Sequence, residues 1–146
     1  MTLYLSGNWY TQLDNHHCQV SLRDTLVNSG VDMYDWSVFS DMDRCENAVK
    51  AVDAIRSCSV YAAVLDAPDH RYAGTFELLG MALALDKRVL IYVDAPVIVD
   101  SDSDSDRGGK RWGTSFDRFL LYHPSIELYV QGGGQFKEFR DELLKL

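Results

Sequence analysis

The sequence predicts an α/β fold, a flavodoxin-like three-layer sandwich with a roughly five-stranded parallel sheet. The first observation is that short apolar segments alternate with longer segments carrying apolar residues at helical spacing. The second is that Val60–Leu65 and Val89–Val93 are nearly continuous apolar runs, as expected for parallel strands buried on both faces. Because the chain has 146 residues and no internal repeat, it is expected to form a single domain, 1–146.

The N-terminal part of the chain supplies two strands and one helix. Residues 2–7 form an apolar strand that ends at Gly7, where the backbone can turn sharply. Residues 19–27 carry apolar side chains at helical spacing, and the Asn-Ser-Gly sequence at 28–30 ends this helix. Residues 31–36 are expected to form the second strand, although polar side chains interrupt it.

Helices precede and follow the first of the two buried strands. Ser40 or Asp41 can cap a helix that extends through Ser57, because apolar residues recur at helical spacing in this segment. A turn that carries Gly74 and Thr75 opens the next helix, which is apolar and leads into the second buried strand.

The C-terminal part begins with an acidic segment. Residues 100–113 are rich in aspartate, serine and glycine and have too little apolar content to pack, so they are predicted to form a flexible loop. Residues 116–124 are expected to form a short helix or turn, 126–130 the last strand and 134–146 an amphipathic helix.

Composition and charge exclude several classes of partner. The formal net charge of −8 argues against a nucleic acid polymer or an anionic membrane as the main partner, since binding to either requires a positively charged protein surface. A small-molecule nucleotide is compatible with this charge, because its phosphate needs only a few local donors. The three cysteines form no C-x-x-C pair, and the N-terminus lacks a signal sequence. A cytoplasmic protein is therefore expected. The mechanism hypothesised below requires no metal or organic cofactor.

Polar and aromatic residues gather where the predicted strands stop. Parallel α/β sheets bind ligands beyond the carboxyl ends of their strands. The segments at these ends are Ser6-Gly7-Asn8-Trp9-Tyr10 after the first strand, Asp66 with Asp69-His70-Arg71-Tyr72 after the third, and Gly74, Thr75 and Glu77 in the following turn and helix. These residues are the candidates for a site.

Glu77 has two competing interpretations. A carboxylate in the first turn of a helix is stabilised by about 0.3–1 kcal/mol through the helix dipole, without any functional role. However, the residues at helical spacing from it, Gly80, Met81 and Ala84, are small or apolar, which would let this face approach the sheet closely. Glu77 would then be partly shielded from water at the strand ends, where a carboxylate can act as a nucleophile toward a sugar carbon.

Two segments carry a resemblance to a known family. The sequences "YLSGNW" and "AGTFELLGMALALDKRV" resemble those of the nucleoside 2-deoxyribosyltransferase family, which includes the 2-deoxynucleoside 5′-monophosphate N-glycosidases. The resemblance implies that Glu77 attacks C1′ of a deoxynucleoside or deoxynucleotide and releases the base, and that deoxyribose then passes to another base or to water. It also implies that Tyr4 holds the nucleophile and that Gly7, Asn8 and Trp9 border the sugar and base.

The resemblance also implies roles for an aspartate and a histidine. Family members carry an aspartate near the position of Arg71, where this chain instead has Asp69 two residues earlier, and another near Ala51, which has only Asn47 and Asp53 nearby. Either Asp66 or Asp69 would therefore hydrogen-bond the base and, when protonated, help it to leave. A homo-oligomer with sites near its subunit interfaces is expected, with His123 as a candidate contribution from a neighbouring subunit.

A phosphate on the substrate would need its own donors. Ser6 and the backbone amides of Gly7 and Asn8 could hold it, with added charge from Arg71 or from Lys110-Arg111 at the end of the acidic loop. The Gly74-Thr75 turn completes the expected substrate-binding set.

Other interpretations remain open. The Gly74-Thr75 turn is also similar to that of cytokinin-activating phosphoribohydrolases, but those have a longer Pro-Gly-Gly-x-Gly-Thr motif. A non-catalytic nucleotide-binding or interaction module with the same fold is the third alternative. The His16-His17-Cys18 cluster and the Asp100–Asp106 run lack the spacing of zinc and calcium sites, so no metal is predicted.

Overall fold

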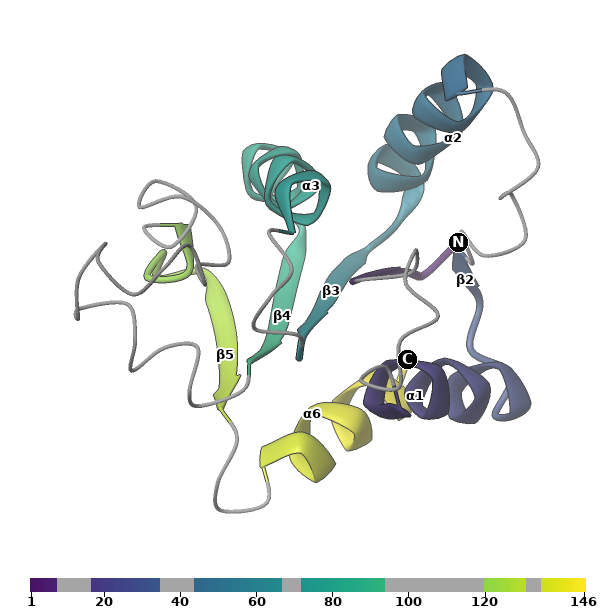
Figure 1. Ribbon diagram of the computed structural model, residues 1–146, viewed down its shortest axis with the longest axis vertical. Coiled ribbons are helices and arrows are strands. Elements are labelled where there is room, and N and C mark those ends of the chain that lie inside the picture. Colours follow the sequence, from purple (N-terminus) through teal and green to yellow (C-terminus); the bar gives the residue numbers. More distant parts are fainter. Residues whose placement is uncertain (8–16, 35–43, 67–71, 94–119, 131–134) are drawn as a thin grey trace, which may run out of the picture.

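The protein is a three-layer α/β sandwich around a parallel sheet (Figure 1). A computed structural model describes residues 1–7, 17–34, 44–66, 72–93, 120–130 and 135–146. Within these residues the sheet has five strands in the order β2-β1-β3-β4-β5, with every neighbouring pair parallel. The strands are β1 (Leu3–Ser6), β2 (Met33–Tyr34), β3 (Val60–Leu65), β4 (Arg88–Val93) and β5 (Ile126–Val130). The predicted fold class is confirmed.

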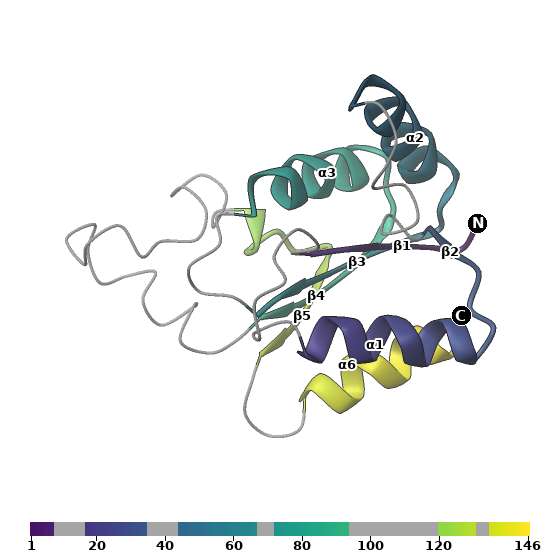
Figure 2. The same ribbon diagram turned by 45° about the vertical axis from the view of Figure 1, so that its right-hand side comes forward.

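Helices cover both faces of the sheet (Figure 2). The helices α2 (Arg44–Ser57) and α3 (Ala73–Ala84) lie on one face, and α1 (His17–Asn28) and α6 (Gln135–Leu144) lie on the other. Every residue of β3 is buried, with alternate side chains in the two separate cores. This explains why its sequence is continuously apolar rather than alternating.

The strand order creates a switch point between β1 and β3. These two strands are neighbours, but the helices that come next along the chain, α1 and α3, lie on opposite faces of the sheet. In sheets of this kind, ligands bind at the carboxyl ends of the two strands that flank the switch point. Ser6 is the last residue of β1, and Asp66 directly follows β3.

Three tyrosines form a ladder across the strands that flank this point. Tyr4 of β1 lies in register with Tyr34 of β2 on one side and with Tyr61 of β3 on the other. The Tyr4 ring stacks on both, with ring centroids 5.0 Å from Tyr34 and 5.8 Å from Tyr61. All three side chains are buried in the core beneath α2 and α3.

The helix α3 starts earlier than the sequence suggests. Its first residue is Ala73, because Phe76 N–H donates to the carbonyl oxygen of Tyr72 at 3.0 Å and closes the first turn. Gly74 and Thr75 are therefore helical rather than part of a preceding turn. No acidic residue lies in the first turn of α3, so the prediction that Glu77 lies there is wrong.

The ends of α1 and α3 have the same hydrogen-bond pattern. After α1, Gly30 has a φ of 76° and donates to Val27, while Val31 donates to Leu26. After α3, Asp86 has a φ of 54° and donates to Leu83, and the next N–H donates to Ala82. Both are Schellman caps, in which the residue with positive φ is usually glycine.

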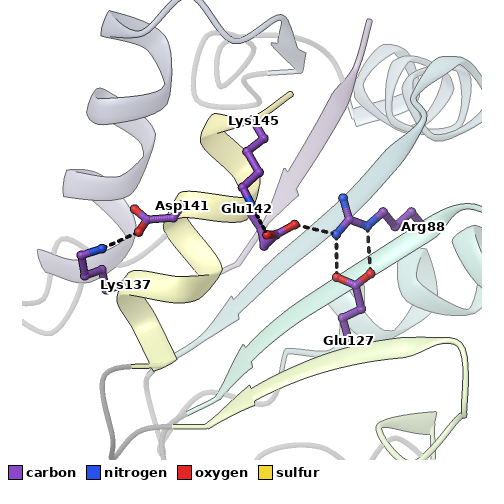
Figure 3. A network of polar contacts seen from close by, with 6 residues as sticks. All are labelled: Arg88, Glu127, Lys137, Asp141, Glu142 and Lys145. Carbon is purple, nitrogen blue, oxygen red and sulfur yellow. Dashed lines mark hydrogen bonds and ion pairs between the residues drawn. The ribbon is translucent and has the colours of Figure 1, made fainter.

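An ion-pair network joins α6 to the edge of the sheet (Figure 3). Arg88 at the start of β4 donates two hydrogen bonds of 2.9 Å to the Glu127 carboxylate of β5. The same guanidinium lies 3.0 Å from Glu142 of α6, which also pairs with Lys145. These bonds and charges raise the pKa of Arg88 and lower the pKa of Glu142.

The segments 8–16, 35–43, 67–71, 94–119 and 131–134 lie outside the described residues, and with them the predicted acidic loop and the candidate calcium run. None of the described helices is both long enough and apolar enough to cross a lipid bilayer.

Candidate active site

A group of buried hydroxyls lies at the carboxyl ends of the strands that flank the switch point. Tyr61 of β3 donates its hydroxyl to the carbonyl oxygen of Thr75 at 2.8 Å. The side-chain oxygens of Ser6 and Thr75 are 3.1 Å apart, so one donates to the other. Burial raises the pKa of Tyr61 well above its ordinary 10.0, so this hydroxyl stays protonated and remains a donor. The predicted substrate-binding residues Ser6 and Thr75 thus connect β1 to the first turn of α3.

A second polar contact, between Asp66 and Tyr72, spans the connection from β3 to α3. The Tyr72 hydroxyl donates to Oδ1 of Asp66 at 3.2 Å and accepts from the Asp66 backbone N–H at 3.1 Å. Both residues are buried, and Tyr72 is only 1% exposed. The two ends of the connection are therefore held together by one side chain.

Tyr72 holds this position in a costly backbone conformation. Its φ of 53° and ψ of 29° are left-handed, which costs about 1–3 kcal/mol for a residue other than glycine. Tyr72 is also the N-cap of α3, yet its side chain makes no capping hydrogen bond to the helix. The side chain points back to β3 instead of serving the helix that it precedes. From the sequence, Tyr72 is expected at the edge of the site, and no local pattern indicates its contact with Asp66.

Glu77 is exposed, so the predicted shielding from water is wrong. The helix α3 buries Phe76, Leu79 and Ala82 against the core. The face with Gly80, Met81 and Ala84, expected to approach the sheet, is half-buried or exposed. Since α3 is apolar on several sides, its sequence does not reveal which side faces the sheet. Glu77 lies on the outer side, one turn after Gly74.

The other predicted residues are only partly brought together. Tyr4 lies in the centre of the tyrosine ladder, and the ladder reaches α3 through the Tyr61 hydroxyl. Gly7 directly follows β1, and Gly74 is exposed, with no heavy atom within 4 Å of an added Cβ. The remaining candidates after the first and third strands, and the basic pair, lie outside the described residues: Asn8, Trp9, Asp69, Arg71, Lys110 and Arg111.

His123 lies at the opposite edge of the sheet within one chain. It is exposed in the turn that leads into β5, and its Nδ1 accepts a hydrogen bond from the Ser125 N–H at 3.1 Å. Because the strands are parallel, this turn belongs to the amino edge, whereas Ser6 and Asp66 lie at the carboxyl edge. A contribution of His123 to the site would therefore have to come from another copy of the chain, which stays a prediction.

The helix α2 carries two polar residues that the sequence offered as candidates, Asn47 and Asp53. Asn47 lies close to the start of α2 and is half-buried. Asp53 is exposed near the other end and lies 3.8 Å from Arg56. Of the two polar candidates of α2, Asn47 is therefore the more buried. Within the described part of the chain, no three histidine, cysteine or acidic side chains converge as metal ligands.

The fold and the position of these groups define an α/β protein with a candidate site at the switch point of a parallel sheet. No family model matches the sequence, and no curated protein matches it. Among solved structures, the chain is similar to the CMP N-glycosidase BcmB of Clostridium botulinum. The two chains are 14% identical, with a TM-score of 0.60 over 100% of each. This likeness agrees with the predicted fold class.

Proposed function

We propose that the chain cleaves the N-glycosidic bond of a nucleoside or a nucleoside 5′-monophosphate. The observation that carries the proposal is the polar group at the switch point. Asp66, Ser6 and Thr75 lie beside the start of the helix that carries Glu77. The fold that holds them aligns over its whole length with a structure named as a CMP N-glycosidase.

The proposed reaction has two displacement steps, as in retaining glycosidases. In the first, a carboxylate oxygen of Glu77 forms a bond to C1′ while the C1′–N bond breaks, and the leaving base takes the proton of Asp66. In the second, water attacks C1′, the ester bond to Glu77 breaks, and the proton of water returns to Asp66. The products are the free base and the sugar or sugar phosphate. A second base in place of water would give deoxyribosyl transfer.

Two sugars have support as substrates. The sequence resemblance points to 2′-deoxyribose, whereas the structural neighbour is named for a ribonucleotide. The two sugars are compared by measuring the release of free base with chromatography. The substrates are each nucleoside and its 5′-monophosphate, in both the ribose and the 2′-deoxyribose series.

The role of Glu77 is tested by replacing it with glutamine. Glu77→Gln is expected to lower base release by about 10³-fold or more, because the amide is a poor nucleophile toward C1′. The matched control is Glu138→Gln, which changes an exposed glutamate on α6 and should leave the rate unchanged. Wild-type activity in Glu77→Gln, with the fold intact by circular dichroism, would exclude this mechanism.

A non-catalytic nucleotide-binding module is the second candidate, and the exposure of Glu77 favours it. The wild-type chain would then bind a nucleotide in calorimetry and release no base on long incubation. We also propose that the chain forms a homo-oligomer with its sites near the subunit interface, since Val49 of α2 and Leu85 at the end of α3 expose large apolar side chains.

A further inference from the structure

We infer that Tyr72 is a positioning residue that fixes Asp66 for proton transfer to the leaving base. The inference rests on the proposed N-glycosidase function and assigns a role to a residue that does not itself touch the substrate.

Tyr72 controls both the main chain and the side chain of Asp66. Its hydroxyl accepts from the Asp66 N–H at 3.1 Å and donates to Oδ1 of the same residue at 3.2 Å. Because Oδ1 accepts the only hydrogen that the hydroxyl can donate, a proton on this carboxyl group is held at Oδ2. Tyr72 thereby determines which of the two oxygens presents the proton.

The backbone at Tyr72 supports a role beyond helix capping. A left-handed residue at this place would be accommodated most easily by glycine or asparagine, and an ordinary N-cap would be serine, threonine, aspartate or asparagine. None of these side chains could reach the end of β3 as the phenol does. The strained conformation at φ 53° is thus accompanied by a contact that only the long side chain makes.

The simpler explanation is that Tyr72 only closes the connection between β3 and α3. A closing contact would affect stability, and its loss would slow the reaction equally for every substrate. A positioning contact acts through Asp66, so its loss should matter only when the base needs a proton to leave. The nature of the leaving base therefore separates the two explanations.

The test compares two nucleotides in the wild type and in Tyr72→Phe. One is the nucleotide with a neutral base that the wild type cleaves best. The other carries 7-methylguanine, which is cationic while bonded to the sugar and leaves as a neutral base without protonation. Tyr72→Phe is expected to lower kcat by about 10- to 100-fold for the neutral base, with KM unchanged, and by less than about 3-fold for 7-methylguanine. Tyr92→Phe, on the opposite face of the sheet, is the control and should change neither rate.

A double-mutant cycle gives a second readout. If Tyr72 acts through Asp66, adding Tyr72→Phe to Asp66→Asn should cause no further loss of kcat for the neutral base. Should Tyr72→Phe prove unstable, the same comparisons are made in the Gly80→Ala background, where the added methyl group meets no atom within 4 Å.

Three results would overturn the inference. One is an equal loss of kcat for both nucleotides in Tyr72→Phe, and another is no loss for either. Both would leave the proposed function standing, because the wild type would still release base. The third is a wild type that cleaves no nucleotide of either kind, which would overturn the proposed function together with this inference.

Discussion

Three described residues have a positive φ, and each begins or ends a helix. Gly30 ends α1 without strain, since it has no side chain to oppose a left-handed backbone. Asp86 occupies the equivalent position after α3, and Tyr72 precedes the same helix. The strain at Asp86 accompanies a complete Schellman cap, whereas the strain at Tyr72 accompanies the contact with Asp66. The same backbone conformation therefore serves two different purposes in this chain.

Two glycine substitutions should change stability in opposite directions. Gly30→Ala is expected to lower the free energy of unfolding by about 1–2 kcal/mol, because alanine is disfavoured at a φ of 76°. Gly80→Ala should raise it by up to about 1 kcal/mol, since Gly80 is helical and an added Cβ meets nothing within 4 Å. Urea unfolding of both variants measures the two values. Changes of the same sign would contradict the assigned conformations.

At the scale of the elements, α3 explains why the site was only partly predictable. The order and type of the strands followed from their apolar runs, and β3 agrees with the predicted bounds. The orientation of α3 did not follow, because apolar residues surround the helix and no polar stripe marks its outer side. The contacts of Tyr61 and Tyr72 join positions 6 to 14 residues apart across a strand and a helix, which no local pattern encodes.

The ion pairs of α6 should make stability depend on pH in the acid range. The pairs with Lys145 and Arg88 hold the pKa of Glu142 below its ordinary 4.5 in the folded chain. A lowered pKa means that the stabilisation is present above pH 4.5 and is lost as the pH falls through the folded value. Between neutral and acid pH, Glu142→Gln should therefore lose less stability than the wild type does, as measured by thermal unfolding.

Added salt provides the control for this prediction. The side chains of the network are partly exposed, so 1 M salt should screen them and reduce the difference between Glu142→Gln and the wild type. An identical acid dependence in both proteins at low salt would show that the network does not contribute.

At the scale of the whole molecule, exposed apolar side chains on the layer of α2 and α3 bear on its assembly. We expect a homo-oligomer in sedimentation equilibrium, formed through the layer of α2 and α3. Leu85 at the end of α3 is 44% exposed, and Leu85→Glu should shift the chain toward the monomer. Val27→Glu is the control, because Val27 is 51% exposed on α1, on the other face of the sheet. A monomeric wild type at all concentrations would contradict the expectation.

The tyrosine ladder also limits the behaviour of the protein in alkali. Burial raises the pKa of Tyr34 and Tyr61 above 10.0, so each phenol loses its proton less readily in the folded core than in the unfolded chain. The unfolded chain takes no such penalty, and it is therefore favoured as the pH rises past 10. Deprotonation of these phenols and unfolding of the central strands should consequently occur together.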